Sequence, residues 1–167
     1  MASVGVLRAV LFLRILTLLT LAASAVLMGL NNITNDDGSK IKFTDLIAYR
    51  YVFAVGAIGF VYTLIQLPFA IYNVLQEKRL IRNACLPEFD YFGDKVMALL
   101  LASGVGVGFG VTFEFKRAFD SVFSDEAKKY LNRANISTGI LLAGTVFMAL
   151  LLAFSSNRRS PKKGMFK

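Results

Sequence analysis

Two charged residues stand inside long apolar runs of this sequence. Arg14 lies about two turns into the first run, and Asp94 lies about one turn into the third. A charge in the hydrocarbon core of a bilayer costs about 2.5–3.5 kcal/mol on insertion scales, so it faces inward, pairs or reaches the headgroups. If both chain ends lie on one side of a membrane, the two charges have similar depths. We predict a structural intramembrane ion pair that fixes the first run against the third.

The spacing of these charges leaves two other interpretations open. Arg14 can instead extend to the headgroups while Asp94 lies at the interface beside Lys95. The pair can also belong to a proton or ion relay, which makes a small transporter or channel subunit the alternative function. A relay needs further ionisable groups near the middle of the membrane, and the other runs supply none there.

The residues that most enzymes use for acid–base and metal chemistry are scarce. The chain has no histidine and a single cysteine, Cys85, so it can form no intrachain disulfide. A zinc site needs several His or Cys ligands, and no nucleophile here has a histidine base. We therefore predict a protein that is not an enzyme, with no catalytic residue, cofactor, metal site or small-molecule substrate.

Four apolar runs must position the two charges. They cover about residues 7–30, 48–72, 89–113 and 136–155. About 20 helical residues cross a hydrocarbon core of about 30 Å, and in lipid the backbone must satisfy its own hydrogen bonds, which favours helices. We predict an all-α membrane protein in which residues 1–167 form a single four-span domain, a four-helix transmembrane bundle.

The first run has an alternative interpretation as a cleaved signal peptide. Ala23-Ser24-Ala25 resembles a small-residue cleavage site. However, Arg14 would then fall inside the apolar region, and the run is long for a signal.

The sequence before the fourth run predicts a further helix, because Ser124 suits a helix cap and Asp125 suits the first turn. That helix would continue into the fourth span.

The basic residues indicate which side of the membrane holds the chain ends. The formal net charge is +8, which in a soluble protein would suggest nucleic-acid binding. Here the clearest basic cluster lies in the tail, residues 156–167, directly after the fourth run, where it suits anionic lipid on the cytoplasmic side. Because four crossings place both ends on the same side, we predict that the N- and C-termini are both cytoplasmic. The position of the basic cluster beside a membrane span predicts the lipid bilayer as its partner and no nucleic acid.

The third run is rich in glycine at helical spacing. Gly104 with Gly108 and Gly106 with Gly110 form two overlapping small-xxx-small patterns. Such residues let helix backbones approach closely where lipid offers no hydrophobic drive between helices. We predict helix packing within the bundle, with association between copies as the alternative.

Three residues are candidates for modification. Asn32 and Asn135 begin N-glycosylation sequons in the two loops that are expected to lie outside. Cys85 lies close to the membrane in the short cytoplasmic loop, where S-palmitoylation occurs. Chance occurrence of the sequons and a plain thiol are the alternatives.

Together these motifs resemble the Casparian strip membrane domain proteins and their CASP-like relatives of land plants, which are similar in architecture to the animal MARVEL proteins. The shared motifs are Leu13-Arg14-Ile15-Leu16 in the first span, Tyr49-Arg50-Tyr51-Val52-Phe53-Ala54 in the second and Tyr91-Phe92-Gly93-Asp94-Lys95-Val96-Met97 in the third. Their order covers nearly the whole chain. The outer loops lack the cysteines of the founding members, so the sequence is more similar to a CASP-like member, of the fourth group.

The resemblance implies a function that composition alone does not. Founding members form a stable scaffold that recruits cell-wall-modifying enzymes at the endodermal barrier. A relative is therefore expected to be a multi-pass plasma-membrane protein that organises a membrane domain. It is expected to associate with itself and with related CASP-like proteins, as a dimer or a higher homo- or hetero-oligomer.

Overall fold

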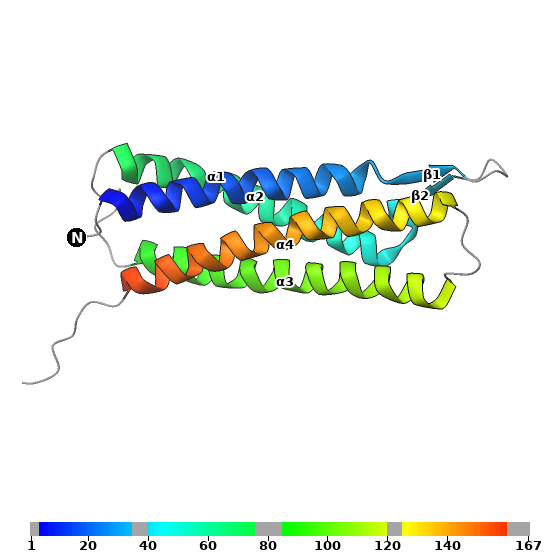
Figure 1. Ribbon diagram of the computed structural model, residues 1–167. Helices are drawn as coiled ribbons and strands as arrows, with labels where there is room; N and C mark the ends of the chain where they lie inside the picture. The colour runs from blue at the N-terminus through cyan, green and yellow to red at the C-terminus, as the bar shows by residue number, and fades with distance from the viewer. Residues whose placement is uncertain (1–3, 35–39, 76–84, 120–124, 160–167) are drawn as a thin grey trace, which may run out of the picture.

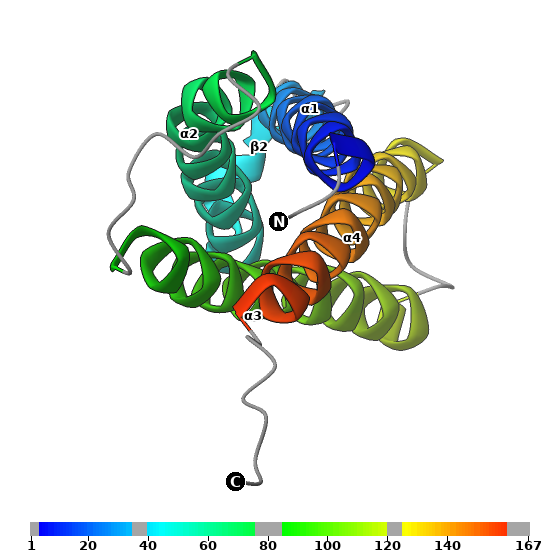
Figure 2. The ribbon, with the colours of Figure 1, turned by 90° about the vertical axis from the view of Figure 1, so that its left-hand side faces the viewer.

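The computed structural model describes residues 4–34, 40–75, 85–119 and 125–159. Four long helices form an up-and-down bundle: α1 (Val4–Gly29), α2 (Ile47–Leu75), α3 (Cys85–Phe119) and α4 (Asp125–Arg159). Each helix contacts the next around the bundle and α4 also contacts α1, so α1 lies diagonally opposite α3 (Figures 1 and 2). The first helix begins and the last helix ends at the same end of the bundle (Figure 1).

All four helices are long and apolar enough to cross a membrane. The apolar segments are Gly5–Gly29, Ile47–Tyr72, Asp90–Ala118 and Glu126–Ser156, with mean hydropathy between 1.8 and 2.3. This confirms the prediction of an all-α membrane protein with a four-helix bundle. The helix predicted before the fourth span is confirmed too, since α4 begins at Asp125 and continues without a break.

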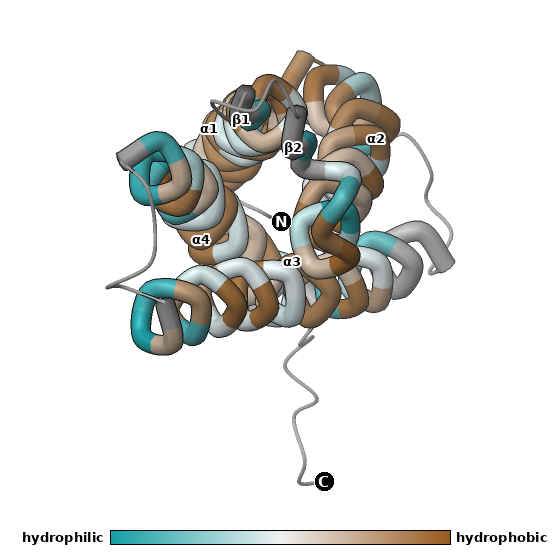
Figure 3. The backbone as a smooth tube through the Cα atoms, turned by 90° about the vertical axis from the view of Figure 1, so that its right-hand side faces the viewer, coloured by the Kyte–Doolittle hydropathy of each residue, from teal (hydrophilic) through white to brown (hydrophobic). Residues whose placement is uncertain are grey.

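A short hairpin, which the sequence patterns did not predict, follows α1. Strand β1 (Asn32–Thr34) pairs antiparallel with β2 (Lys40–Lys42), with Asn32 opposite Lys42, and the 3₁₀ turn η1 (Phe43–Asp45) leads into α2. The hairpin lies at the end of the bundle away from the start of α1 (Figure 1). In Figure 3, which faces this end, hydrophilic residues gather at the nearby helix ends while the helix bodies are mostly apolar.

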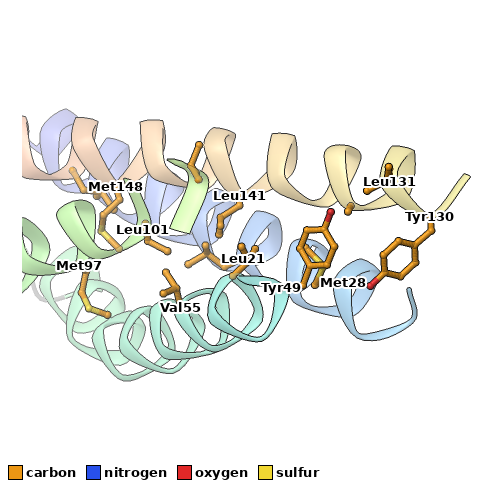
Figure 4. Close-up of a cluster of buried hydrophobic side chains, with 14 of the residues drawn as sticks. Leu21, Met28, Tyr49, Val55, Met97, Leu101, Tyr130, Leu131, Leu141 and Met148 are labelled. Carbon is orange, nitrogen blue, oxygen red and sulfur yellow. The ribbon is translucent and has the colours of Figure 1, made fainter. Parts of the chain in front are cut away.

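Each helix places a seam of residues toward the bundle interior at alternating spacings of three and four. On α1 the buried seam is Leu7, Val10, Arg14, Thr17, Leu21, Ser24 and Met28. Spacing of this kind is typical of left-handed bundles with knobs-into-holes packing. Leu21, Leu101, Leu141 and Met148 from three helices meet in the middle of the core (Figure 4).

The opposite faces of the helices are apolar as well. Phe12 is 62% exposed, Ile65 61% and Leu99 65%, one from each of three helices. A water-soluble monomer rarely exposes apolar surface on this scale, whereas lipid tails cover it without cost. The fold is therefore that of a multi-pass membrane protein whose buried seams carry its specific contacts.

Candidate functional site

A polar cluster in the core draws one or more residues from every helix. Arg14 comes from α1, Tyr62 and Gln66 from α2, Asp94 from α3 and Ser155 from α4. Arg14 and Asp94 occupy seam positions that a leucine would fill elsewhere, and they are only 4% and 0% exposed. The cluster lies in the half of the bundle where α1 begins and α4 ends.

The Asp94 carboxylate is the centre of this cluster. Arg14 Nη2 lies 3.4 Å from Asp94 Oδ2 and 3.5 Å from Oδ1, across the bundle diagonal. The Tyr62 hydroxyl donates to Oδ1 at 2.9 Å, and the Ser155 hydroxyl donates to Oδ2 at 3.2 Å. Gln66 Nε2 donates in turn to the Tyr62 hydroxyl at 3.1 Å. One carboxylate thus accepts hydrogen bonds from the three other helices.

Gly93 makes room for this arrangement. A Cβ atom at that position would lie 2.5 Å from the Tyr62 hydroxyl oxygen, closer than real Cβ contacts allow. The absence of a side chain beside Asp94 therefore lets the tyrosine reach the carboxylate. The glycine in this motif serves a close approach between α2 and α3.

The contacts of the cluster are those of a buried ion pair with additional hydrogen bonds. A buried ion pair is favourable only when further hydrogen bonds satisfy its remaining polar atoms, and its best-attested benefit is to specify one arrangement over others. Both Asp94 oxygens have partners, whereas Arg14 Nη1 has none among the described residues. Within the same described ranges, no group of three or more His, Cys, Asp or Glu side chains could hold a metal ion.

Sequence reasoning had not assigned Tyr62, Gln66 or Ser155 to the site of Arg14 and Asp94. Gln66 carried a usable signal, because it is a buried polar residue inside an apolar run, at seam spacing from Thr63. Tyr62 carried a similar signal, since a tyrosine hydroxyl in the middle of the apolar segment Ile47–Tyr72 needs a hydrogen-bond partner. Ser155 lies at the end of its apolar segment and carried none. The sequence had also left open whether Arg14 pairs or extends to the headgroups, and here it pairs.

The four predicted packing glycines separate into two pairs that face opposite ways. A Cβ on Gly104 would lie 3.0 Å from Val55 Cγ1, and one on Gly108 would lie 2.6 Å from Thr138 Oγ1. A Cβ on Gly106 or Gly110 would meet nothing within 4 Å. The first pair therefore lets α2 and α4 approach α3, and the second pair faces away from the bundle.

Comparison with known proteins decides the family. A sequence model of the Casparian strip membrane protein domain matches residues 4–147 of this chain. The chain belongs to this family. Residues Arg14, Tyr62 and Asp94 all lie within the matched segment, and Ser155 lies beyond it. No solved structure matches the chain.

The individual relatives are CASP-like proteins of plants. CASP-like protein 4D1 of Glycine max is 36% identical over 156 residues, covering 93% of this chain and 89% of the relative. CASP-like protein 4D1 of Ricinus communis is 37% identical, covering 89% of each chain. CASP-like protein 4D2 of Arabidopsis thaliana is 33% identical, covering 87% of this chain and 86% of the relative. These similarities confirm the resemblance to the fourth CASP-like group.

The two candidate sequons lie in different settings. Asn32 is exposed at the start of β1. Asn135 lies inside α4, where its Oδ1 atom is buried without a partner among the described residues. Ser137 of the second sequon is 0% exposed and exchanges hydrogen bonds with Ser24, at 2.8 Å and 2.9 Å, so it helps to join α4 to α1.

Two other groups of predicted residues fall partly or wholly outside the described part of the chain. Cys85 begins α3, but its side chain is not described, so the palmitoylation candidate stays a prediction. The basic tail was predicted to begin at residue 156, and α4 continues to Arg159. Residues 160–167 lie outside the described residues.

Tyr62→Phe tests the contribution of the Tyr62 hydroxyl to the polar cluster in this CASP-like protein. The change removes the donor to Asp94 and the acceptor for Gln66 while keeping the ring. Because a hydrogen bond to a charged group contributes about 1.5–3 kcal/mol, we expect a clearly lower thermal stability in detergent. The measurement is the melting temperature of the purified protein. Tyr72→Phe, at an exposed tyrosine on the same helix, is the matched control and should leave the melting temperature unchanged.

Proposed function

We propose that this chain is a non-enzymatic scaffold of the plasma membrane that associates with itself and with related four-span proteins. Family membership supports the general assignment. The outward-facing glycines of α3 carry the proposal, because they offer a contact surface that the bundle itself leaves open. The polar cluster supports it as well, since ties among all four helices suit a rigid building block.

The outward surface of α3 has the properties of a helix-association face. Gly106 and Gly110 are exposed one turn apart, with the exposed side chains of Leu99 and Phe113 along the same helix. In lipid there is no hydrophobic drive between helices, so association depends on close packing, which small residues allow. We propose that a second copy or a related CASP-like protein packs its own helix against this face.

We also propose that both chain ends lie in the cytoplasm. The common end of α1 and α4 supports this orientation, together with the basic residues that follow α4 (Figure 1). Protease digestion of a C-terminal tag in sealed, right-side-out plasma-membrane vesicles tests it. Protection of the tag agrees with the proposal, and cleavage of the tag in intact vesicles contradicts it.

The double substitution Gly106→Leu with Gly110→Leu tests the proposed association face. We expect crosslinking between copies in native membranes to fall about ten-fold, because two leucine side chains hold the backbones apart. Bundle stability should be preserved, since a Cβ at either position meets nothing within 4 Å. Crosslinking with a membrane-permeant reagent, followed by gel analysis, gives the measurement.

Gly139→Leu supplies the matched control for this experiment. Gly139 also has open space around its Cβ position, but it lies on α4. We expect this variant to crosslink like the unmodified protein. Equal crosslinking by all three proteins would show that the outward face of α3 is not the contact surface and would remove the main support for the proposal.

A further inference from the structure

A cleft opens between the end of α1 and the third and fourth turns of α4. It has a volume of about 180 Å³ and is lined by Leu27, Leu30, Arg133 and Ile136. The end of α1 and the beginning of α4 both lie at the hairpin end of the bundle (Figure 1). None of these four residues belongs to the polar cluster or to the outward face of α3.

The depth of the cleft places it where hydrocarbon gives way to lipid headgroups. The apolar segment of α1 ends at Gly29, so Leu27 lies inside it and Leu30 lies just beyond it. Leu30 is 69% exposed and Ile136 is 59% exposed, so the apolar walls open outward rather than into the core. Surfaces of this kind, at this height, face the upper part of lipid acyl chains.

Arg133 adds a cation above the apolar walls. Its side chain is exposed and interacts electrostatically with the Glu126 carboxylate, but it forms no ion pair with a carboxylate of the described ranges. The neighbouring cation Lys129 already pairs with Glu126 at 2.8 Å. A guanidinium presents planar, paired donors that match phosphate oxygens, and it keeps its charge at any physiological pH. A phosphate is therefore the group that this position suits best.

We propose that the cleft binds one phospholipid molecule, with Arg133 on its phosphodiester and Leu27, Leu30 and Ile136 against its acyl chain. The observation behind the proposal is an exposed guanidinium, without an ion pair among the described residues, in the lining of an apolar, lipid-facing cleft. A phospholipid carries both matching groups, a phosphate and an acyl chain, in one molecule. The bound lipid would lie on the outer surface of the bundle, where α1 and α4 meet.

Native mass spectrometry of the full-length protein in detergent tests the proposal. The probes are dioleoyl phosphatidylglycerol, dioleoylglycerol, which has the same acyl chains without phosphate, and inorganic phosphate. We expect a one-lipid adduct with the phospholipid and about ten-fold lower affinity in Arg133→Gln, the loss expected when one charge-assisted contact disappears. Arg117→Gln, at an exposed arginine in the last turn of α3, should bind like the unmodified protein.

Any of the following three results would overturn the proposal. Equal adduct formation by Arg133→Gln and the unmodified protein removes Arg133 from any lipid site. Equal binding of dioleoylglycerol shows an apolar groove without a phosphate contact. Competition by inorganic phosphate at the same concentration as the lipid shows an anion site that holds no lipid chain. Because Arg133 is exposed, the variant is expected to fold, and an unchanged melting temperature in detergent checks this.

Discussion

Asp94→Ala is expected to remove most of the protein from the membrane fraction and to leave the remainder unstable in detergent. The change leaves Arg14 buried and uncompensated, with its Nη2 atom deprived of the carboxylate at 3.4 Å. Breaking a buried ion pair by deleting one partner costs about 3–5 kcal/mol. The Tyr62 and Ser155 hydroxyls lose their acceptor at the same time. Yield per membrane mass and melting temperature after purification measure the effect.

Two further variants separate the charge from other causes. Glu114→Ala removes an exposed carboxylate from the same helix and should leave yield and melting temperature unchanged. Arg14→Leu combined with Asp94→Ala removes both charges, and we expect it to recover part of the lost yield, because apolar replacement of a buried pair is often neutral. If Asp94→Ala matched the unmodified protein in both measurements, the polar cluster would have no role in stability.

Gly108→Leu is the second change with a large expected effect. A Cβ at this position would lie 2.6 Å from Thr138 Oγ1 and 2.7 Å from Thr138 Cγ2. Thr138 cannot give way easily, because it is fully buried, branched at Cβ and bonded to the Ala134 carbonyl at 2.9 Å. The two helices must therefore separate. Overpacking costs about 1–3 kcal/mol and at times more, so we expect a markedly lower melting temperature.

Gly106→Leu is the matched control, because it makes the same change on the same helix, on the opposite face. Replacing glycine inside a helix gains about 1 kcal/mol of helix propensity, so without a clash the melting temperature should stay equal or rise. The expected contrast is thus a destabilised Gly108→Leu beside a stable Gly106→Leu. If both variants melted at the same temperature, the close packing of α3 on α4 at Gly108 would be wrong.

The amino-acid sequence by itself determined that lipid surrounds the apolar runs of this protein and that these runs are helical. Four runs of about 20 apolar residues can cross a bilayer only as helices, and this needs no knowledge of their neighbours. The start of α4 at Asp125 agrees with the prediction from the local pattern of Ser124 and Asp125. The cost of a charge in lipid also marked Arg14 and Asp94 as residues that need a partner or an escape to the headgroups.

Only the tertiary structure decided how each helix is rotated about its own axis. In a water-soluble bundle the apolar stripe shows which face lies inside, but here lipid and core are equally apolar, so hydropathy does not distinguish the two faces. The sequence therefore could not say that Gly104 and Gly108 face inward while Gly106 and Gly110 face the lipid. It could not show that the Arg14–Asp94 pair crosses the bundle diagonal, or that Tyr62 and Ser155 complete it. These contacts depend on the simultaneous packing of four seams, which no single segment specifies.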